Sequence, residues 1–550
     1  MNTFKKSGHI VDAVNKVQFD GTVEVVDGKI VSVNEESVPG DSPYIMPGFV
    51  DSHIHIESTL LTPANFAALA VTKGMVAVVT DPHEIVNVTG LEGFEFMVRN
   101  GKKVHFHFHF GAPPCVPCTG FETAGAVIGS KDIEALLKRE EVYGISEFMN
   151  AFGVLTGDSE CMAKLAAARK AGKPVDGHAP GLCSEDLRRY AQAGITTDHE
   201  CVSLEEGRDR IRCGMLVQIR EGSAAGDFGT LSPLLAESED MLMFCSDDKY
   251  PNELKEGYID AMVRDALAQG YPLWNVLNAA CVTPVLHYGL KSGLLRKGDN
   301  ADFIVVDNLK DFNVLETYID GIRVYGDGAL CKDDFVLDNT EEVEFPNQFS
   351  AEHISAGDLK VPYESGRKLK VMTAEDLSLR TGMETVTPKV EDGYVVQDIE
   401  NDVLKIVVYN RYVKASPQVA FIKGFSLKTG AIGSTIAHDS HNIIAIGTSD
   451  DEIVRVINTL IDSKGGLLIC DGHSISGIKL PVAGLMSPLD GDTIAIKYSA
   501  LKTMACSQGC PFNAPFMTMA FMALPVIPDL KLTDKGLFDV RKFEFTSLFV

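Results

Sequence analysis

Two histidines separated by one residue, His53 and His55, follow a Pro-Gly pair near the start of the chain. The turn signal and the residues after it predict a short strand over Val50–Ile56. Alternate side chains of a strand share one face, so both imidazoles point the same way. Two neighbouring imidazoles can hold one divalent metal ion. The alternative is that both histidines are ordinary polar residues on a strand face.

The elements that must position such a site alternate between strand and helix patterns. The predicted strands are Val50–Ile56, Met75–Thr80, Val104–Phe110, Gly144–Phe148, Pro174–Gly177, Ile195–Asp198, Met215–Arg220 and Met241–Cys245. Helical patterns lie between several of them, including Lys131–Glu140 and Ser184–Ala193. Strand–helix units repeated over roughly 250 residues are what a TIM-type barrel needs, so we predict an α/β fold with a (β/α)8 barrel.

Metal-capable side chains cluster at the ends of these predicted strands, whereas the strand bodies are rich in Val, Ile, Met and Phe. The polar residues at the strand ends are His53, His55, Asp81, His83, Glu84, Glu147, His178, His199, Asp247 and Asp248. The active site of a TIM-type barrel lies where its strands end and its loops begin. Any single histidine here is more simply explained as a structural residue. Several histidines with carboxylates at the same end of the barrel favour a metal site.

Shorter alternating segments flank the predicted barrel. Residues 21–31 predict a hairpin with Asp-Gly at its turn, and strand and turn patterns return after residue 289. The predicted domains are a metal-dependent barrel over residues 47–288, a discontinuous β-sandwich over residues 1–46 and 289–331, an acidic linker over residues 332–358, and a C-terminal α+β domain over residues 359–550. A helix is predicted near Asp450–Ser463 in the C-terminal domain.

The composition excludes several kinds of partner. The 550 residues carry a formal net charge of -26, whereas nucleic acid and anionic membranes attract clustered Lys and Arg. The most apolar stretch, Ala514–Ile527, is interrupted by two prolines and is shorter than the roughly 20 residues that span a bilayer. Met1–Gln18 has no signal-peptide pattern, and 12 cysteines do not suggest a disulfide scaffold. We therefore expect a cytoplasmic protein that binds neither nucleic acid nor membrane.

Several of these motifs together resemble a known superfamily. A His-x-His after Pro-Gly, later single histidines and a late aspartate are similar to the amidohydrolase superfamily. The Gly-x-x-x-x-Gly-x-x-Ala-Asp segment that ends at Asp302 resembles its flanking sandwich. Longer strings resemble the bacterial adenine deaminase family; these are Pro47–Ser58, Asp81–Val88, Cys115–Pro117, His438–Asn442, Leu480–Ser487 and Leu524–Pro528. The resemblance runs nearly from end to end and includes the C-terminal domain, which most amidohydrolases lack.

The resemblance implies the hydrolysis of adenine to hypoxanthine and ammonia, a step of purine salvage, at a site with two divalent metal ions. Manganese or iron is expected there, and zinc is possible. Carried over by motif position, the ligands would be His53, His55, His178, His199 and Asp247. Many relatives bridge their metals with a carboxylated lysine from the fourth strand. Here that strand ends in Ile145-Ser146-Glu147, so Glu147 is the bridging candidate. We also expect a homo-oligomer, a dimer or higher.

Hydrolytic deamination needs a hydroxide at neutral pH and protons for the purine ring and the leaving ammonia. Bound metal lowers the pKa of water from 15.7 to about 7, and the hydroxide would attack C6. Asp247 would accept the hydroxide's proton, or would be a ligand only. Glu84, which with Asp81 matches the family's acidic pair beside the substrate, would shuttle a proton to the ring or support a ligand histidine. Asp81 would orient His83 or bind the substrate. Asp248 would contact the exocyclic amine or be a solvated loop carboxylate.

Two other patterns offer different metal sites. His55-Ile56-Glu57 and Pro114–Cys118 match the H-x-E…P-C-x-x-C signature of zinc-dependent deaminases, with one zinc on His55, Cys115 and Cys118. This interpretation is disfavoured because it leaves the other strand-end histidines without a role.

The second pattern is the alternation of three histidines with phenylalanines at His105, His107 and His109. The alternation puts all three imidazoles on one strand face. A barrel strand with one polar face is favoured here over a second metal site.

Two other functions stay open. One is an amidohydrolase that opens a cyclic amide, as in dihydropyrimidinase-like enzymes; Glu147 in place of the lysine counts against it. The other is a non-catalytic binding protein on the same scaffold, against which the full set of ligand candidates counts. His438, Asp439 and His441 form a polar cluster in the C-terminal domain, which would cap the barrel mouth or serve a subunit contact.

Overall fold

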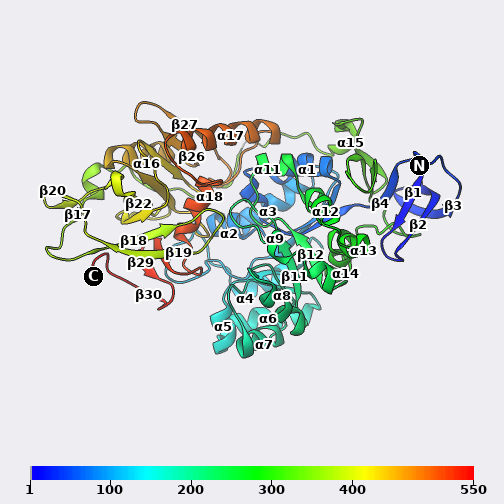
Figure 1. Ribbon diagram of the computed structural model, residues 1–550, viewed down its shortest axis with the longest axis horizontal. Coiled ribbons are helices and arrows are strands. Elements are labelled where there is room, and N and C mark those ends of the chain that lie inside the picture. The colour runs from blue at the N-terminus through cyan, green and yellow to red at the C-terminus, as the bar shows by residue number, and fades with distance from the viewer. Residues whose placement is uncertain (1–2, 343) are drawn as a thin grey trace.

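The computed structural model describes residues 3–342 and 344–550, with a closed (β/α)8 barrel at its centre (Figure 1). The parallel barrel strands are β5 (Phe49–Ile54), β6 (Met75–Thr80), β7 (His107–Ala112), β8 (Val142–Phe148), β9 (Val175–Gly177), β10 (Thr197–Asp198), β11 (Leu216–Arg220) and β12 (Leu242–Cys245). The ring closes where Ile54 forms a parallel bridge to Asp247, and where Thr196 N donates to Val175 O at 2.9 Å. The predicted barrel fold is confirmed.

Helices connect the barrel strands along the chain. They are α1 (Pro63–Ala70), α2 (His83–Thr89), α3 (Leu91–Gly101), α4 (Ser130–Leu136), α5 (Ala151–Thr156), α6 (Ser159–Ala171), α7 (Ser184–Gln192), α8 (Leu204–Arg212), α9 (Phe228–Leu231), α10 (Leu234–Glu237), α11 (Pro251–Glu256), α12 (Ile259–Ala268), α13 (Leu273–Leu277) and α14 (Thr283–Tyr288). Every residue of β6 and β8 is buried. Strands that are buried on both faces are expected where helices cover the outside of a parallel sheet.

The third strand differs from the predicted Val104–Phe110, because β7 begins at His107. The residues before it pair with the segment after the barrel instead. Val104 bridges Val336, and His105 N donates to Phe335 O at 2.8 Å. Local alternation cannot reveal that a distant segment satisfies these backbone groups.

One predicted helix is also shorter than expected. The pattern over Lys131–Glu140 predicted a helix to residue 140, but α4 ends at Leu136. The chain then tightens, and Arg139 N donates to Leu136 O at 3.0 Å over three residues instead of four.

The segments before and after the barrel form one eight-stranded sheet in the order β16-β15-β14-β13-β4-β1-β2-β3. Its strands are β1 (Thr3–Asp12), β2 (Val17–Val26), β3 (Lys29–Glu35), β4 (Tyr44–Pro47), β13 (Phe303–Val306), β14 (Val314–Ile319), β15 (Ile322–Gly326) and β16 (Ala329–Leu330). β4 is the joint, because it pairs with β1 on one side and with β13 on the other. Asp27 and Gly28, both at positive φ, make the predicted hairpin turn between β2 and β3.

The C-terminal domain is built on a second eight-stranded sheet, in the order β19-β18-β23-β22-β25-β24-β26-β27. Its strands are β18 (Leu369–Ala374), β19 (Thr381–Val386), β22 (Leu404–Tyr409), β23 (Gln418–Lys423), β24 (Ala431–Ser434), β25 (Ile443–Gly447), β26 (Gly466–Cys470) and β27 (Ile475–Lys479). Two smaller sheets comprise β17 (Val361–Pro362), β20 (Val390–Glu391) and β21 (Tyr394–Val395), and β28 (Leu530–Thr533), β29 (Gly536–Asp539) and β30 (Glu544–Phe545).

Helix α16 (Asp450–Ser463) has the predicted bounds and is capped at its N-terminus by Ser449, whose hydroxyl accepts from Glu452 N at 3.3 Å. Its buried residues Ile453 and Leu460 pack in one apolar cluster with residues of the sheet. The remaining helices are α15 (Lys332–Phe335), α17 (Gly491–Ser507) and α18 (Pro515–Ala520). The domain boundaries themselves stay a prediction. Residues 1–2 of the predicted sandwich and residue 343 of the predicted linker lie outside the described residues.

The C-terminal domain packs directly against the barrel. Ser487 N donates to Leu60 O at 2.8 Å, and Leu61 forms a bridge to Ser487. A single apolar core contains barrel residues such as Val78 together with Met519 of the C-terminal domain. Within the described residues, we find no helix that is long and apolar enough to cross a membrane.

Candidate active site

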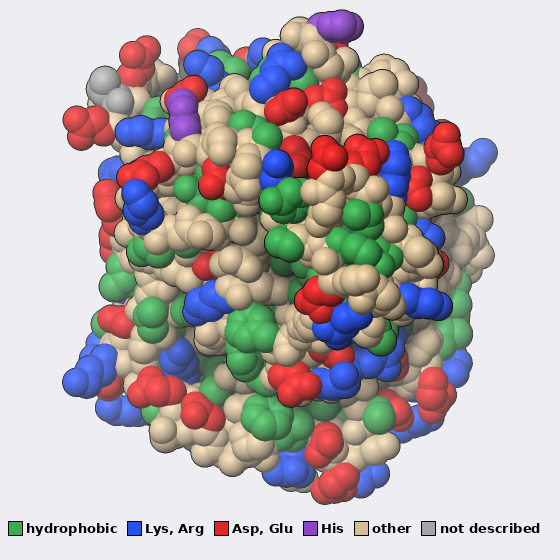
Figure 2. All heavy atoms as spheres, turned by 90° about the vertical axis from the view of Figure 1, so that its left-hand side faces the viewer, with side chains coloured by type: hydrophobic (Ala, Val, Ile, Leu, Met, Phe, Trp, Pro, Cys, Tyr) green, Lys and Arg blue, Asp and Glu red, His purple; other side chains and the backbone are tan. Residues whose placement is uncertain are grey.

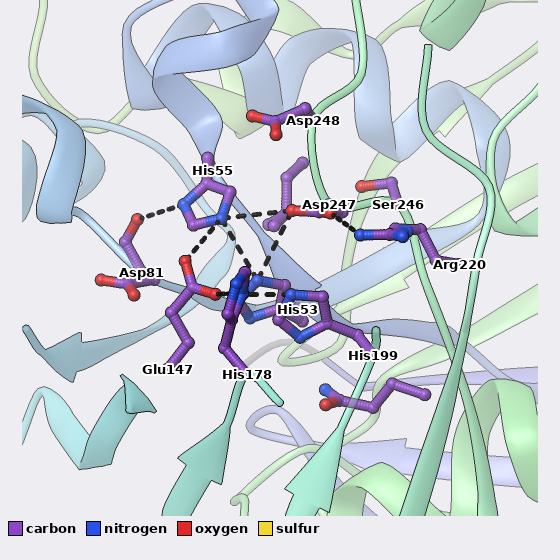
Figure 3. Close-up of polar contacts among 12 residues, drawn as sticks. His53, His55, Asp81, Glu147, His178, His199, Arg220, Ser246, Asp247 and Asp248 are labelled. Carbon is purple, nitrogen blue, oxygen red and sulfur yellow. Dashed lines mark hydrogen bonds and ion pairs between the residues drawn. The ribbon is translucent and has the colours of Figure 1, made fainter. Parts of the chain in front are cut away.

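The carboxyl ends of the barrel strands bring His53, His55 and Asp247 together (Figure 3). The Nε2 atoms of His53 and His55 are 3.2 Å apart. Asp247 follows β12 and places its Oδ1 3.2 Å from His55 Nε2 and 3.6 Å from His53 Nε2. His55 Nδ1 donates to the backbone oxygen of Asp81 at 3.1 Å. When the His55 ring is neutral, its proton therefore lies on Nδ1 and its Nε2 lone pair faces the cluster.

Glu147, at the end of β8, lies between two groups of histidines. Its Oε1 is 3.4 Å from His55 Nε2, and its Oε2 is 3.4 Å from His199 Nε2. His178 Nδ1 donates to the same Oε2 at 2.8 Å. One carboxylate whose two oxygens face different histidines has the geometry to bridge two cations.

All six predicted ligand positions therefore converge at one place, and all are buried. The residues are His53, His55, Glu147, His178, His199 and Asp247. Atoms of these side chains form several groups in which each donor lies within 4.8 Å of the others. Imidazole and carboxylate donors together suit Zn²⁺, Mn²⁺ or Fe²⁺.

Three further residues contact this cluster, and none of them was among the ligands predicted from the sequence. His83 Nδ1 lies 3.4 Å from Glu147 Oε1, and Glu200 Oε1 lies 3.5 Å from His199 Nε2. Arg220 Nη1 donates to Glu200 at 2.6 Å and to Asp247 Oδ2 at 2.9 Å. Both Glu200 and Arg220 stand at strand ends, so the rule that found the other candidates could have found them.

Buried negative charge dominates the electrostatics of the cluster. Burial raises the pKa of Glu147 and of Asp247, but the surrounding imidazoles outweigh burial and hold both pKa values well below the usual range. Burial alone would lower the pKa of the His55 imidazole, but Asp247 and other carboxylates outweigh burial and hold this pKa well above the usual value. The carboxylates therefore need positive charge close by, which protons or divalent cations can supply.

The residues present fit a metal. His178 Nε2 and His199 Nδ1 are buried and have no hydrogen-bond partner, and neither ring nitrogen of His83 has one. Buried polar atoms are normally satisfied, and a metal ligand is one role that leaves an imidazole nitrogen without a hydrogen bond. These side chains are the ones that could hold a metal ion.

Glu84 lies in the first turn of α2 and lines the same inner cavity as predicted ligands such as His55 and Glu147. His438 Nδ1 donates to its Oε1 at 2.8 Å, and His441 Nε2 lies against its Oε2. Burial raises the pKa of Glu84, but these two histidines outweigh burial and hold it well below the usual range. His438 and His441 thus cover this side of the barrel mouth, which is one of the two roles the sequence left open.

The remaining two acidic candidates have different surroundings. Asp81 Oδ1 accepts from His83 N at 3.0 Å, and its Oδ2 is 3.1 Å from His83 Nδ1, so it is placed to orient that ring. The Ser58 hydroxyl donates to Asp248 Oδ1. Asp248 is only 8 % exposed, so it is not a solvated loop carboxylate. Burial and the nearby charge of Asp247 raise the pKa of Asp248.

Two adjoining cavities lead to the cluster. The inner one, of about 20 Å³, is lined by residues of the cluster and by His438, Asp439 and Phe521, and is on the scale of a single water. The outer one has a volume of about 480 Å³, and its lining includes Phe121, Phe152 and Phe543. We call it the entrance cavity. Both cavities are lined by Met149 and His178, so they adjoin.

The H-x-E…P-C-x-x-C pattern is not assembled as a zinc site. His55 belongs to the strand-end cluster, whereas the Cys118 thiol donates to Glu122 Oε1 at 2.7 Å. Burial raises the pKa of Cys115 to about 11 and that of Cys118 well above its usual value. Both thiols are therefore protonated in this arrangement, and the Cys118 thiol is engaged by Glu122 rather than by His55.

The three alternating histidines lie around the start of β7. His107 Nε2 is 3.2 Å from Asp302 Oδ1, in the flanking sheet. His109 is half-buried, and its partial removal from solvent lowers its pKa to about 3, whereas His105 precedes the strand. Among the described residues, neither His105 nor His109 forms a hydrogen bond to Asp302. The three histidines therefore do not converge on one carboxylate, and a polar strand face describes them better than a metal site.

The chain is similar in sequence to known protein families. Residues 44–324 match the amidohydrolase family, and residues 378–544 match the adenine deaminase C-terminal domain. The chain is 48% identical to an adenine deaminase of Methanosarcina mazei, over 99% of both chains. It is 48% identical to one of Salinibacter ruber, over 100% of this chain and 99% of the other. It is 40% identical to one of Borreliella burgdorferi over the full length of both.

Proposed function

The chain belongs to the adenine deaminase family of amidohydrolases, and from this premise we propose that it hydrolyses adenine to hypoxanthine and ammonia in purine salvage. The observation that carries the proposal is the similarity over the full chain, C-terminal domain included. The buried histidine and carboxylate cluster supplies the matching chemistry. These full-length relatives are all adenine deaminases, so the cyclic-amide alternative has no support.

We propose that the cluster holds two divalent ions, Mn²⁺ or Fe²⁺, with zinc as a possible substitute. His53, His55, His178, His199 and Asp247 would be ligands, and Glu147 would bridge, as its two oxygens facing different histidines support. When bound, such ions lower the pKa of water from 15.7 to about 7 and so supply hydroxide at neutral pH.

The chain's own residues handle the protons. Asp247 accepts the proton of the attacking hydroxide as its oxygen bonds to C6. Glu84 carries a proton to the ring nitrogen. The proton that Asp247 accepted passes to the exocyclic amine, and the C6–nitrogen bond then breaks to release ammonia. Asp248, buried beside Asp247, would contact the exocyclic amine. Asp81 would bind the substrate or orient His83, whose Nδ1 lies 3.1 Å from Asp81 Oδ2.

The residues that line the entrance cavity favour a flat, uncharged substrate. Its walls are largely apolar and include three phenylalanine rings, Phe121, Phe152 and Phe543. None of the described residues that line it is a lysine or an arginine, the side chains that bind phosphate. A free purine base therefore suits this route better than a phosphorylated nucleotide.

We also propose that the protein is a cytoplasmic homo-oligomer, a dimer or higher, that binds neither nucleic acid nor membrane. The net charge of -26 supports the exclusion of polyanions. On the face in Figure 2, acidic and basic side chains are interspersed with hydrophobic ones, and neither sign of charge dominates. Light scattering during size-exclusion chromatography measures the number of subunits.

Ammonia release tests the reaction. Protein loaded with Mn(II) is mixed with adenine, and ammonia and hypoxanthine are measured as adenine is consumed. We expect equal amounts of both products, and none after the metal is removed with a chelator. Dihydrouracil serves as the cyclic-amide control and is expected to stay intact. Metal-loaded, folded protein that leaves adenine untouched would show that the assigned reaction is wrong.

A further inference from the structure

The loop between β24 and β25 carries side chains from the C-terminal domain into the barrel mouth. His438 and His441 lie on this loop and are 2 % and 0 % exposed. Their rings face opposite oxygens of the Glu84 carboxylate, His438 at Oε1 and His441 at Oε2. More than 350 positions separate His438 from Glu84 along the chain, so only the packing of the two domains creates this arrangement.

His441 is held with its proton aimed at Glu84. Its Nδ1 accepts a hydrogen bond from Ala437 N at 3.3 Å. A neutral imidazole that accepts at Nδ1 carries its proton on Nε2, the atom that faces Glu84 Oε2. Arg411 Nη1 donates to the backbone oxygen of His441 at 3.2 Å. Because Arg411 is fully buried, it fixes the loop from behind.

His438 is fixed independently of His441. Its backbone N donates to Ala520 O at 3.1 Å, and its ring stacks on Phe521 with centroids 4.2 Å apart and an interplanar angle of 19°. Both partners belong to the segment around α18. The ring is therefore held by its backbone and by one face, while Nδ1 reaches Glu84 Oε1 at 2.8 Å.

The barrel alone provides little to hold Glu84. The carboxylate is 2 % exposed, and its nearest barrel partner is His83, whose Nε2 lies 3.4 Å from Oε1 without a hydrogen bond. Among the described residues, the side-chain hydrogen bond to Glu84 comes from His438. A buried carboxylate without donors would be costly and free to rotate.

We propose that His438 and His441 are positioning residues that hold the Glu84 carboxylate toward the substrate, so that the C-terminal domain completes the active site. The inference rests on the proposed function, in which Glu84 carries a proton to the purine. Proton transfer requires hydrogen-bond reach, and a misplacement of about 1 Å can cost about 10²-fold in rate. Removing either ring therefore lowers kcat without emptying the metal site.

The two contacts call for different conservative replacements. The amide nitrogen of asparagine lies near the position of histidine Nδ1, and that of glutamine lies near Nε2. We expect His438→Ala and His441→Ala each to lower kcat by about 10–100-fold, with a small change in KM and the metal content of the parent. His438→Asn and His441→Gln recover most of this loss, whereas His438→Gln and His441→Asn do not.

His473→Ala is the matched control. His473 is an exposed histidine of the same domain, and its side chain has no part in this arrangement. Metal content and melting temperature are measured on every variant. Loss of metal in His438→Asn, or equal rates for His438→Asn and His438→Gln, would overturn the positioning role.

A double mutant separates this inference from the proposed function. In a Glu84→Gln background, His438→Ala is expected to cost no more, because its target is already gone. An undiminished effect of His438→Ala in that background shows that His438 does not act through Glu84. If Glu84→Gln is slow and His438→Ala alone is as fast as the parent, only the positioning role fails. If Glu84→Gln itself runs at the parent rate, the proton shuttle of the proposed function fails, and this inference fails with it.

Discussion

Arg220 Nη1 lies 2.9 Å from Asp247 Oδ2, which leaves Oδ1 of Asp247 to face His55 at 3.2 Å. The guanidinium also binds Glu200 and Asp227, so three carboxylates share one buried cation. Asp247 is therefore oriented by a charge that cannot titrate. One of its oxygens is fixed by Arg220, and the other is directed at the proposed metals.

Asp247→Asn is expected to remove two functions at once. The amide cannot accept the hydroxide's proton, and it is a weaker metal ligand than a carboxylate. We predict a kcat loss of at least about 10²–10⁴-fold, the range of general acid–base catalysis, together with lower metal occupancy. Elemental analysis and kcat are measured on the same sample. Full metal content and parent kcat would show that Asp247 is neither a ligand nor the base.

Glu84→Gln is expected to change the rate but not the metal content. The substitution keeps the shape of the side chain and removes its titrating group. We predict a kcat loss of about 10²–10⁴-fold, or roughly 3–5 kcal/mol of barrier. The measurement is kcat with parent and variant loaded with the same metal. If the variant instead loses metal, Glu84 supports a ligand and the two carboxylates were assigned wrongly.

Glu147→Gln tests the bridge. Its two carboxylate oxygens face His55 at 3.4 Å and His178 at 2.8 Å. An amide offers one oxygen and one N–H donor group, so we expect both metal occupancy and activity to fall. Elemental analysis of the parent provides the reference value, which we expect to be two metals per chain. One metal per chain in fully active parent protein would contradict the binuclear site.

Cys118→Ser distinguishes the barrel site from the zinc-deaminase pattern. The thiol is buried and donates to Glu122 rather than to the cluster, and a serine hydroxyl can donate to the same oxygen. We expect metal content and kcat close to those of the parent. Cys161→Ser, another buried free thiol, is the control for general effects of losing sulfur. A metal site emptied by Cys118→Ser alone would revive the pattern with Cys115 and Cys118.

Lys531 is expected to make stability depend on pH. Burial lowers its pKa from 10.5 to about 7, and Nζ donates to Leu379 O at 3.0 Å and to Phe521 O at 2.9 Å. A neutral amine has two N–H groups, one for each carbonyl. Between pH 7 and 10.5 the unfolded chain binds more protons than the folded one, so this group's contribution to stability rises with pH.

The prediction is checked with Lys531→Met. The melting temperature of the parent minus that of the variant should become more positive between pH 7 and pH 9.5. Lys497→Met, at an exposed position, is the control and should show no such trend. A difference that is the same at both pH values would mean that Lys531 is charged in the folded protein.

The sequence by itself determined the barrel and most of its site. The residues of β6 have the predicted bounds because an apolar strand between helices is recognisable from its own neighbours. His53, Glu147 and Asp247 could be chosen because parallel strands bring their carboxyl ends to one place. The strand-end candidates follow from local order repeated around a ring, whereas the choice of six predicted ligands among them came from the family resemblance.

Only the tertiary structure decided how the C-terminal domain takes part. The string that contains His438 and His441 is visible in the sequence, but nothing near it points to Glu84. Likewise, the start of β7 at His107 depends on Val104 pairing with Val336. In both cases the deciding contact joins segments hundreds of residues apart. Such contacts are set by how whole domains bury their apolar faces, which the spacing of neighbouring residues does not encode.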